Sequence, residues 1–82
     1  MSMENTINEI RKIICNVARL EEKQVRETTS LRNELMLDSI QAMQIINLIE
    51  EKYNTKIDEI EIFNVDNIEE IVELLEEYKQ KV

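Results

Sequence analysis

The chain has 82 residues, of which 43% are hydrophobic, and it carries a formal net charge of −8 with no His, Gly or Pro. The lack of His excludes a Ser-His-Asp triad and a His metal ligand, and a single Cys excludes an internal disulfide or a multi-Cys zinc site, so we expect no metal. The charge argues against nucleic acid as a partner, and no apolar run is long enough for a membrane span or a signal peptide, so we expect a cytoplasmic monomer with one domain over residues 1–82.

The negative charge is concentrated in the second half of the chain. Residues 1–32 carry six Lys/Arg and five Asp/Glu, whereas residues 33–82 carry four and thirteen, a net charge of −9. This acidic half is either a solvated surface or a body that attracts basic partner surfaces over a Debye length of about 8–10 Å.

Apolar residues at helical spacing predict a first helix over about residues 4–20. The stripe consists of Ile7, Ile10, Ile13, Ile14, Val17 and Leu20. Cys15 projects away from this stripe at 100° per residue. We therefore expect a partly exposed thiol without a redox function.

Residues 21–38 form a long connection, which is unusual in a small domain and often functional. Thr28, Thr29 and Ser30 punctuate it. We expect an ordered loop in which Leu31 and Leu35 insert into the core, on a short helical turn.

A second helix is predicted over about residues 40–53, because Asp38 or Ser39 can cap the amides of its first turn. Its core stripe contains Ala42, Ile45, Ile46, Ile49 and Tyr53.

Several residues of the second helix point away from this stripe. Large apolar side chains beside Ser39 suggest a partner surface, and the alternative is burial under the long connection. The predicted partner surface consists of Ile40, Met43, Gln44 and Asn47.

The rest of the chain predicts packing elements. Residues 57–63 read as one short helical turn, because Asp58 and Glu61 have capping-box spacing. A last helix over about residues 65–79, capped by Asn64 or Asp66, has a stripe made of Val65, Ile68, Ile71, Val72, Leu75 and Tyr78. The predicted fold is therefore all-α, a small bundle of three main helices plus one short helix.

Asp38-Ser39 alone predicts only a helix cap, but the residues on both sides of this pair form a more specific pattern. The segment resembles the signature of the phosphopantetheine carrier family, which contains acyl and peptidyl carrier proteins. The residues that carry the resemblance are Leu31, Glu34, Leu35, Leu37, Asp38, Ser39 and Ile40, supported by Ile49-Glu50-Glu51-Lys52-Tyr53 and by Asn64-Val65 as the opening of the last helix.

The resemblance implies that Ser39 bears 4′-phosphopantetheine, with Asp38 as the adjacent motif residue. A phosphopantetheinyl transferase would install the group from coenzyme A, and its thiol would hold cargo as thioesters for a loading enzyme and downstream synthase enzymes. The chain's own residues agree, since a helix start suits a phosphodiester and no base is available to activate Ser39 as a nucleophile. We therefore expect a carrier and not an enzyme.

The sequence departs from the family at two places. Met36 stands where the family usually has Gly. If the position needs positive φ, either Met36 is strained or the loop is rebuilt. An exposed Met36 would instead add a soft apolar contact near the arm. Gln41 and Gln44 stand where fatty-acid carriers often have acids.

The leading hypothesis is a discrete carrier of acyl or aminoacyl groups in polyketide, nonribosomal peptide or related fatty-acid-type biosynthesis. A D-alanyl carrier for cell-wall modification is one alternative. The other is an acidic interaction module on the same fold that carries nothing.

Overall fold

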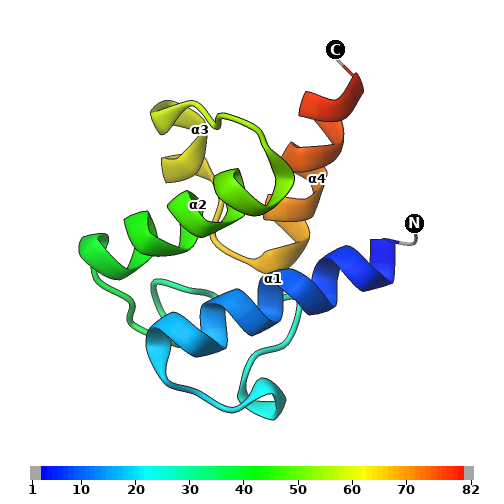
Figure 1. Cartoon of the computed structure of the whole chain (residues 1–82). Helices are drawn as coiled ribbons and strands as arrows, with labels where there is room; N and C mark the ends of the chain where they lie inside the picture. The colour runs from blue at the N-terminus through cyan, green and yellow to red at the C-terminus, as the bar shows by residue number, and fades with distance from the viewer. Residues whose placement is uncertain (1–2, 81–82) are drawn as a thin grey trace.

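The computed structural model describes residues 3–80, without the side chains of residues 59, 63, 79 and 80, so both ends of the predicted domain lie outside the described residues. The helices are α1 (Met3–Ala18), α2 (Ser39–Tyr53), α3 (Glu59–Asn64) and α4 (Ile68–Gln80), with a 3-10 turn, η1 (Glu22–Gln24), in the connection after α1. The all-α bundle with one short helix is confirmed (Figure 1). No helix within residues 3–80 is long and apolar enough to cross a membrane.

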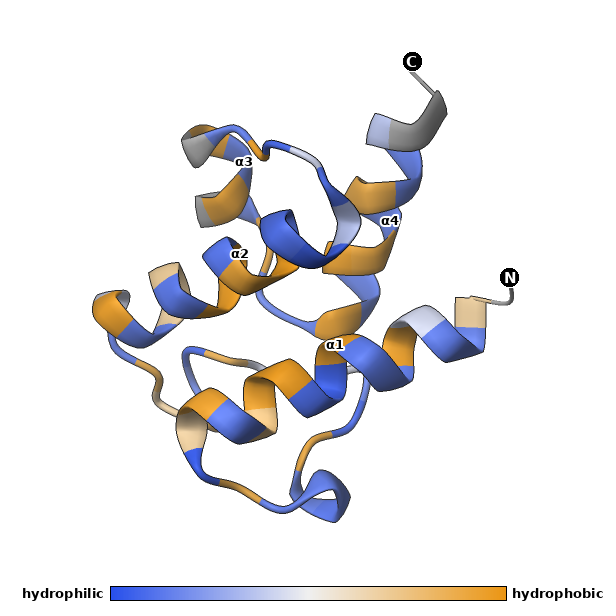
Figure 2. Ribbon diagram, in the orientation of Figure 1, coloured by the Kyte–Doolittle hydropathy of each residue, from blue (hydrophilic) through white to orange (hydrophobic). Residues whose placement is uncertain are grey.

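The core lies where α1 packs against α2 and α4. Its largest fully buried side chains are Ile10, Ile14, Val25, Ile45, Ile49, Ile68, Ile71 and Val72. Figure 2 shows hydrophobic and hydrophilic segments alternating along these helices. The predicted stripes are therefore confirmed, and Leu74 is a buried residue that the stripe of the last helix did not include.

The prediction of a partly exposed Cys15 is wrong, because the side chain is 7% exposed. η1 packs on α1 and brings Glu22 near the thiol, on a side of the helix that periodicity assigned to solvent. Burial, followed by the charge of Glu22, raises the pKa of Cys15.

Residues in left-handed conformation follow α1 and α2 and end them. Arg19 has φ 58° and Asn54 has φ 51°, the geometry that Gly usually provides at helix C-termini. The Leu20 N–H donates to the Cys15 carbonyl at 3.0 Å, and the Thr55 N–H donates to that of Glu50 at 3.0 Å.

Two predicted helix caps are wrong. Asp58 precedes α3 but makes no side-chain cap bond. The reciprocal half of the predicted capping box is also absent, because the Asp58 N–H donates to the Tyr78 hydroxyl at 3.0 Å and that hydroxyl donates to Glu61. α4 begins at Ile68 rather than near residue 65, and the Glu70 N–H donates to Asn67 Oδ1 at 2.9 Å. The cap is thus neither Asn64, which ends α3, nor Asp66, which makes other bonds.

A polar contact also joins α1 to α2. The Tyr53 hydroxyl donates to Glu9 Oε2 at 2.8 Å, and Lys52 Nζ lies 3.4 Å from the same oxygen. The hydrogen bond from Tyr53 is the main cause that lowers the pKa of Glu9, while burial raises the pKa of the Tyr53 hydroxyl. This contact fixes the end of α2 that is far from Ser39.

Candidate functional site

Ser39 is the first residue of α2, and its position follows from local chemistry. Asp38 is the N-cap: its Oδ1 accepts the Gln41 N–H at 2.8 Å, and Gln41 Oε1 accepts the Asp38 N–H at 3.2 Å. This capping box satisfies two terminal donors, and of the two residues that the sequence offered as the cap, Asp38 is the one that caps α2. Ser39 is exposed, and within residues 3–80 no hydrogen bond holds its hydroxyl. The start of α2 lies on the side of the molecule opposite the two chain ends (Figure 1).

An apolar cavity of about 270 Å³ opens beside Ser39. It lies between α2, the connection and the segment that joins α3 to α4. Its lining consists of Leu31, Arg32, Leu37, Asp38, Ser39, Ala42, Met43, Ile45, Ile46, Ile62, Val65, Asp66 and Ile71. Arg32 is the single cation of this lining. Leu31 and Leu35 pack against the core as predicted, and Leu31 also forms part of the cavity wall.

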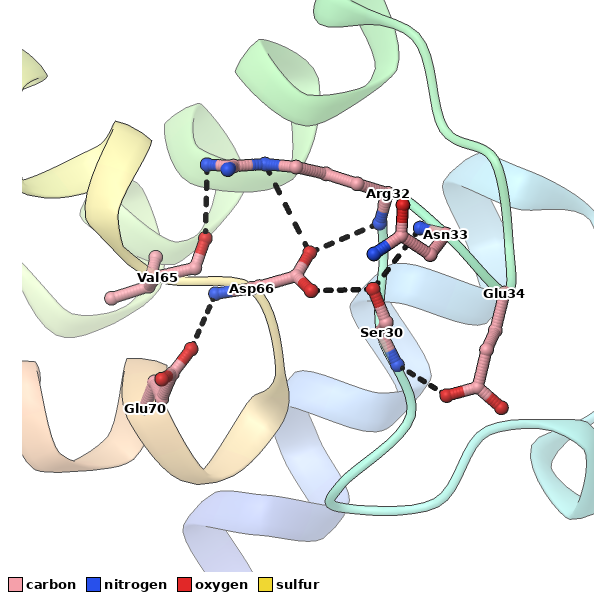
Figure 3. Close-up of polar contacts among 7 residues, drawn as sticks. All are labelled: Ser30, Arg32, Asn33, Glu34, Val65, Asp66 and Glu70. Carbon is pink, nitrogen blue, oxygen red and sulfur yellow. Dashed lines mark hydrogen bonds and ion pairs between the residues drawn. The ribbon is translucent and has the colours of Figure 1, made fainter.

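One wall of the cavity is held by polar contacts that we call the Asp66 latch, made by Ser30, Arg32 and Asp66 (Figure 3). The Ser30 hydroxyl and the Arg32 backbone N–H both donate to the Asp66 carboxylate, the latter at 3.0 Å. The Leu31 N–H donates to the Asp66 carbonyl at 2.8 Å. The latch therefore ties the connection to the segment between α3 and α4.

Neighbouring groups support both sides of the latch. The Ser30 N–H donates to Glu34 Oε2 at 2.9 Å, and the Asn33 N–H donates to Ser30 Oγ at 3.0 Å. On the other side, the Asp66 N–H donates to Glu70 Oε1 at 2.6 Å. Sequence reasoning missed the latch, because Ser30 and Asp66 are 36 positions apart and no local pattern pairs them.

The predicted surface residues are where the helical spacing put them. Ile40 is 70% exposed, Met43 is 39% exposed, and Gln44 and Asn47 are exposed, so the alternative of burial under the connection is wrong. Figure 2 shows hydrophobic colour in the first turn of α2, at the end of the helix away from the two chain ends. Met43 also lines the cavity, so it borders both the cavity and the surface.

Met36 adopts the left-handed conformation that is expected of a Gly position. Its φ is 53° and its side chain is 79% exposed. A non-Gly residue in this region costs roughly 1–2 kcal/mol. The Leu37 N–H donates to the Leu31 carbonyl at 3.0 Å, which closes the connection around this residue. Met36 is thus both strained and apolar in water.

A second hollow, of about 540 Å³, lies at the other end of the connection and is bordered by charged residues. Arg11 on its wall already has partners: Nε donates to the Val25 carbonyl at 2.8 Å, Nη1 to Asn8 Oδ1 at 2.6 Å, and Nη2 lies 3.6 Å from Glu27. This hollow is open to solvent and remote from Ser39 in the chain, so it is the weaker candidate.

The residues around Ser39 fit a phosphodiester-linked group. The hydroxyl is exposed at a helix start, where the dipole favours an anion, and Arg32 lies in the wall of the adjoining cavity. The flexible remainder of such a group can extend into solvent or along the cavity. Asp38 contributes one negative charge beside the same position, which a basic partner would offset.

Comparison with known proteins shows the family of the chain. The family described as phosphopantetheine attachment site matches residues 8–75. A polyketide-8 synthase acyl carrier protein 1 of Streptomyces avermitilis is 28% identical over 72 residues, covering 88% of this chain and 86% of the relative. An acyl carrier protein of Buchnera aphidicola is 28% identical over 93% of this chain and 97% of the relative, and one of Cyanophora paradoxa is 29% identical over 80% and 64%. The chain therefore belongs to the phosphopantetheine carrier family, and it is a carrier rather than an enzyme.

Proposed function

We propose that Ser39 is the attachment point of 4′-phosphopantetheine and that the chain carries acyl intermediates on it as thioesters. The observation that carries this proposal is an exposed serine hydroxyl at the first residue of a capped helix, beside an apolar cavity. When bound, the group supplies the thiol that forms the thioester. The chain's own residues present the hydroxyl, fix the first turn of α2 and offer an apolar wall to the cargo.

The test is intact mass after incubation with coenzyme A and a broad-specificity phosphopantetheinyl transferase. Wild type should gain the mass of one phosphopantetheinyl group, and Ser39→Ala should gain none. Ser30→Ala is the matched control, because it removes the other serine within residues 3–80 and should still be modified. Modification of Ser39→Ala, or no modification of wild type by any compatible transferase, would refute the proposal.

The cavity favours acyl cargo over a D-alanyl group. Its lining is mostly aliphatic, and its volume lies just below the lower end of small-molecule pockets, about 300 Å³. An apolar chain would be stabilised there, whereas the ammonium of D-alanine would have to be desolvated against these side chains. The comparison is between chains loaded with butyryl, hexanoyl and D-alanyl groups. The melting temperature should rise with acyl length and should not rise with D-alanyl; the reverse order would favour the D-alanyl carrier.

The pathway that we propose is polyketide or related fatty-acid-type biosynthesis, because an aminoacyl group on a nonribosomal peptide carrier would meet the same desolvation cost as D-alanine. Two observations support it: Gln41 and Gln44 replace acids at the start of α2, and one relative carries a polyketide synthase name. The partners would be the transferase, a loading enzyme and downstream synthase enzymes, which contact the surface made of Ile40, Met43, Gln44 and Asn47. An acidic module without cargo would fail the mass test above.

A further inference from the structure

Three exposed apolar residues lie within four positions of Ser39, and we call them the Ser39 patch: Met36, Ile40 and Met43. Ile40 and Met43 belong to the first two turns of α2, but Met36 lies before the helix, on the opposite side of Ser39 in the chain. Large apolar side chains beside a functional residue mark a binding surface more often than isolated ones do.

Met36 is the member of this patch that folding explains least. A φ of 53° favours Gly or Asn at this position, and a residue that is 79% exposed contributes little to the hydrophobic core. A Gly at this position would relieve the backbone and remove an apolar side chain from water. Two unfavourable features at one residue, next to the modified position, point to a use outside the folded monomer.

We propose that Met36 is a specificity-determining contact for the transferase that modifies Ser39, an enzyme that uses coenzyme A and presents an apolar surface with a basic rim. This inference rests on the proposed function. Three residues span at most about 11 Å, so the Met36 Cα lies within that distance of the Ser39 Cα. A standard interface covers about 800 Å² on each partner, which is a disc of roughly 16 Å radius. A patch of that radius centred on the Ser39 hydroxyl is wide enough to include Met36.

The charges around Met36 indicate which residues should border the apolar surface of the transferase. Glu34 and Asp38 flank Met36 and Leu37 in the chain and both are exposed, and residues 33–82 carry a net charge of −9. An apolar centre within an acidic surface is complementary to an apolar surface bordered by Lys and Arg. The flexible thioether of Met adapts to such a surface without a fixed geometry.

The experiment compares transferase kcat/KM and melting temperature for four variants of the full chain. Met36→Gly and Met36→Asn suit the left-handed backbone but remove the apolar side chain, whereas Met36→Leu keeps the apolar bulk and the strain. Met3→Ala is the control, because Met3 is also an exposed methionine, at the start of α1.

The expected result is a divergence between the two measurements. Met36→Gly and Met36→Asn should lower kcat/KM by about tenfold and raise the melting temperature by about 4–8 °C. The kcat/KM of Met36→Leu and Met3→Ala should stay within about twofold of wild type. Wild-type rates for the Gly and Asn variants would overturn the inference, as would a tenfold loss in Met36→Leu or Met3→Ala. Because wild type is loaded in the same series, such a failure is separate from a failure of Ser39 to be modified.

Discussion

The two faces of α2 carry similar large apolar side chains in opposite environments. Ile45, Ile46 and Ile49 on the inner face are at most 5% exposed, whereas Ile40 on the outer face is 70% exposed. α1 packs against α2, and the buried inner-face residues share one core with α4. The apolar residues of this helix therefore have two uses: one face stabilises the fold, and the other contributes little to folding and adjoins Ser39.

The largest effect expected on stability is at the inner face. Ile49→Ala removes a side chain with no exposed surface and leaves a cavity, so it should cost about 2–5 kcal/mol of the roughly 5–15 kcal/mol available to a small domain. Ile46→Ala and Leu75→Ala should behave similarly. Urea unfolding measures the loss. If all three midpoints match wild type, the buried stripes are assigned to the wrong faces.

The next effect concerns the Asp66 latch, which holds the cavity wall near the outer face. Asp66→Ala leaves the Ser30 hydroxyl and the Arg32 N–H without their acceptor, and hydrogen bonds to a charged group contribute about 1.5–3 kcal/mol. We therefore expect the free energy of unfolding, measured in urea, to fall by about 2 kcal/mol. The Arg32–Asp66 ion pair, at 3.9 Å with Arg32 more than half exposed, should add little.

The matched control for Asp66 is Glu73→Ala on α4. It removes the same charge from an exposed position, so its stability should change by no more than about 0.5 kcal/mol. Equal losses in the two variants would mean that the latch contributes nothing and that only the net charge matters.

The outer face should respond in function rather than in stability. Ile40→Ala or Met43→Ala should slow modification of Ser39 by about tenfold, which corresponds to roughly 1.4 kcal/mol of lost contact. Melting curves should show a smaller shift than for Ile46→Ala. If the two variants melt far below wild type while the folded fraction reacts normally, these residues belong to the core.

The contrast between the faces was predictable from the sequence because it depends on local periodicity. The stripes of α1, α2 and α4 and the Asp38 cap all follow from spacing within a few residues. The exposure of Ile40 follows for the same reason, since 100° per residue turns it away from Ile45 and Ile49.

The wrong predictions have a different cause, which is contact with other elements of the fold that the spacing within one helix does not show. Asp66 had a good spacing to cap the last helix, but its carboxylate accepts hydrogen bonds from residues 30 and 32. Glu61 could have completed a capping box, but Tyr78 donates to it. Cys15 is buried, and η1, which contacts α1, brings Glu22 near its thiol; periodicity within α1 cannot reveal either fact. A local pattern supplies candidate acceptors and faces, and the tertiary fold decides which are used.

The smallest effect on stability is expected at Asp38, the N-cap of α2, which supports the folded helix and also lies next to Ser39. Its carboxylate caps α2 and so supports the folded helix, while its charge lies beside Ser39 at the outer end. Asp38→Ala should lose about 1 kcal/mol of stability, whereas Asp38→Asn, an equally good cap, should lose only a few tenths. Urea unfolding separates the two.

Loading kinetics then isolate the charge, because Asp38→Asn keeps the cap and removes only the negative charge. An acid that a basic partner surface attracts acts mainly on the rate of encounter, so Asp38→Asn should load severalfold more slowly than wild type at low salt. The difference in loading rate between Asp38→Asn and wild type should become smaller as the ionic strength rises, because salt screens an exposed charge within a Debye length of about 8–10 Å. If Asp38→Asn loads as fast as wild type at every salt concentration, Asp38 acts as a helix cap alone, and the resemblance that made it part of the site reflects the geometry of α2 rather than contact with a partner.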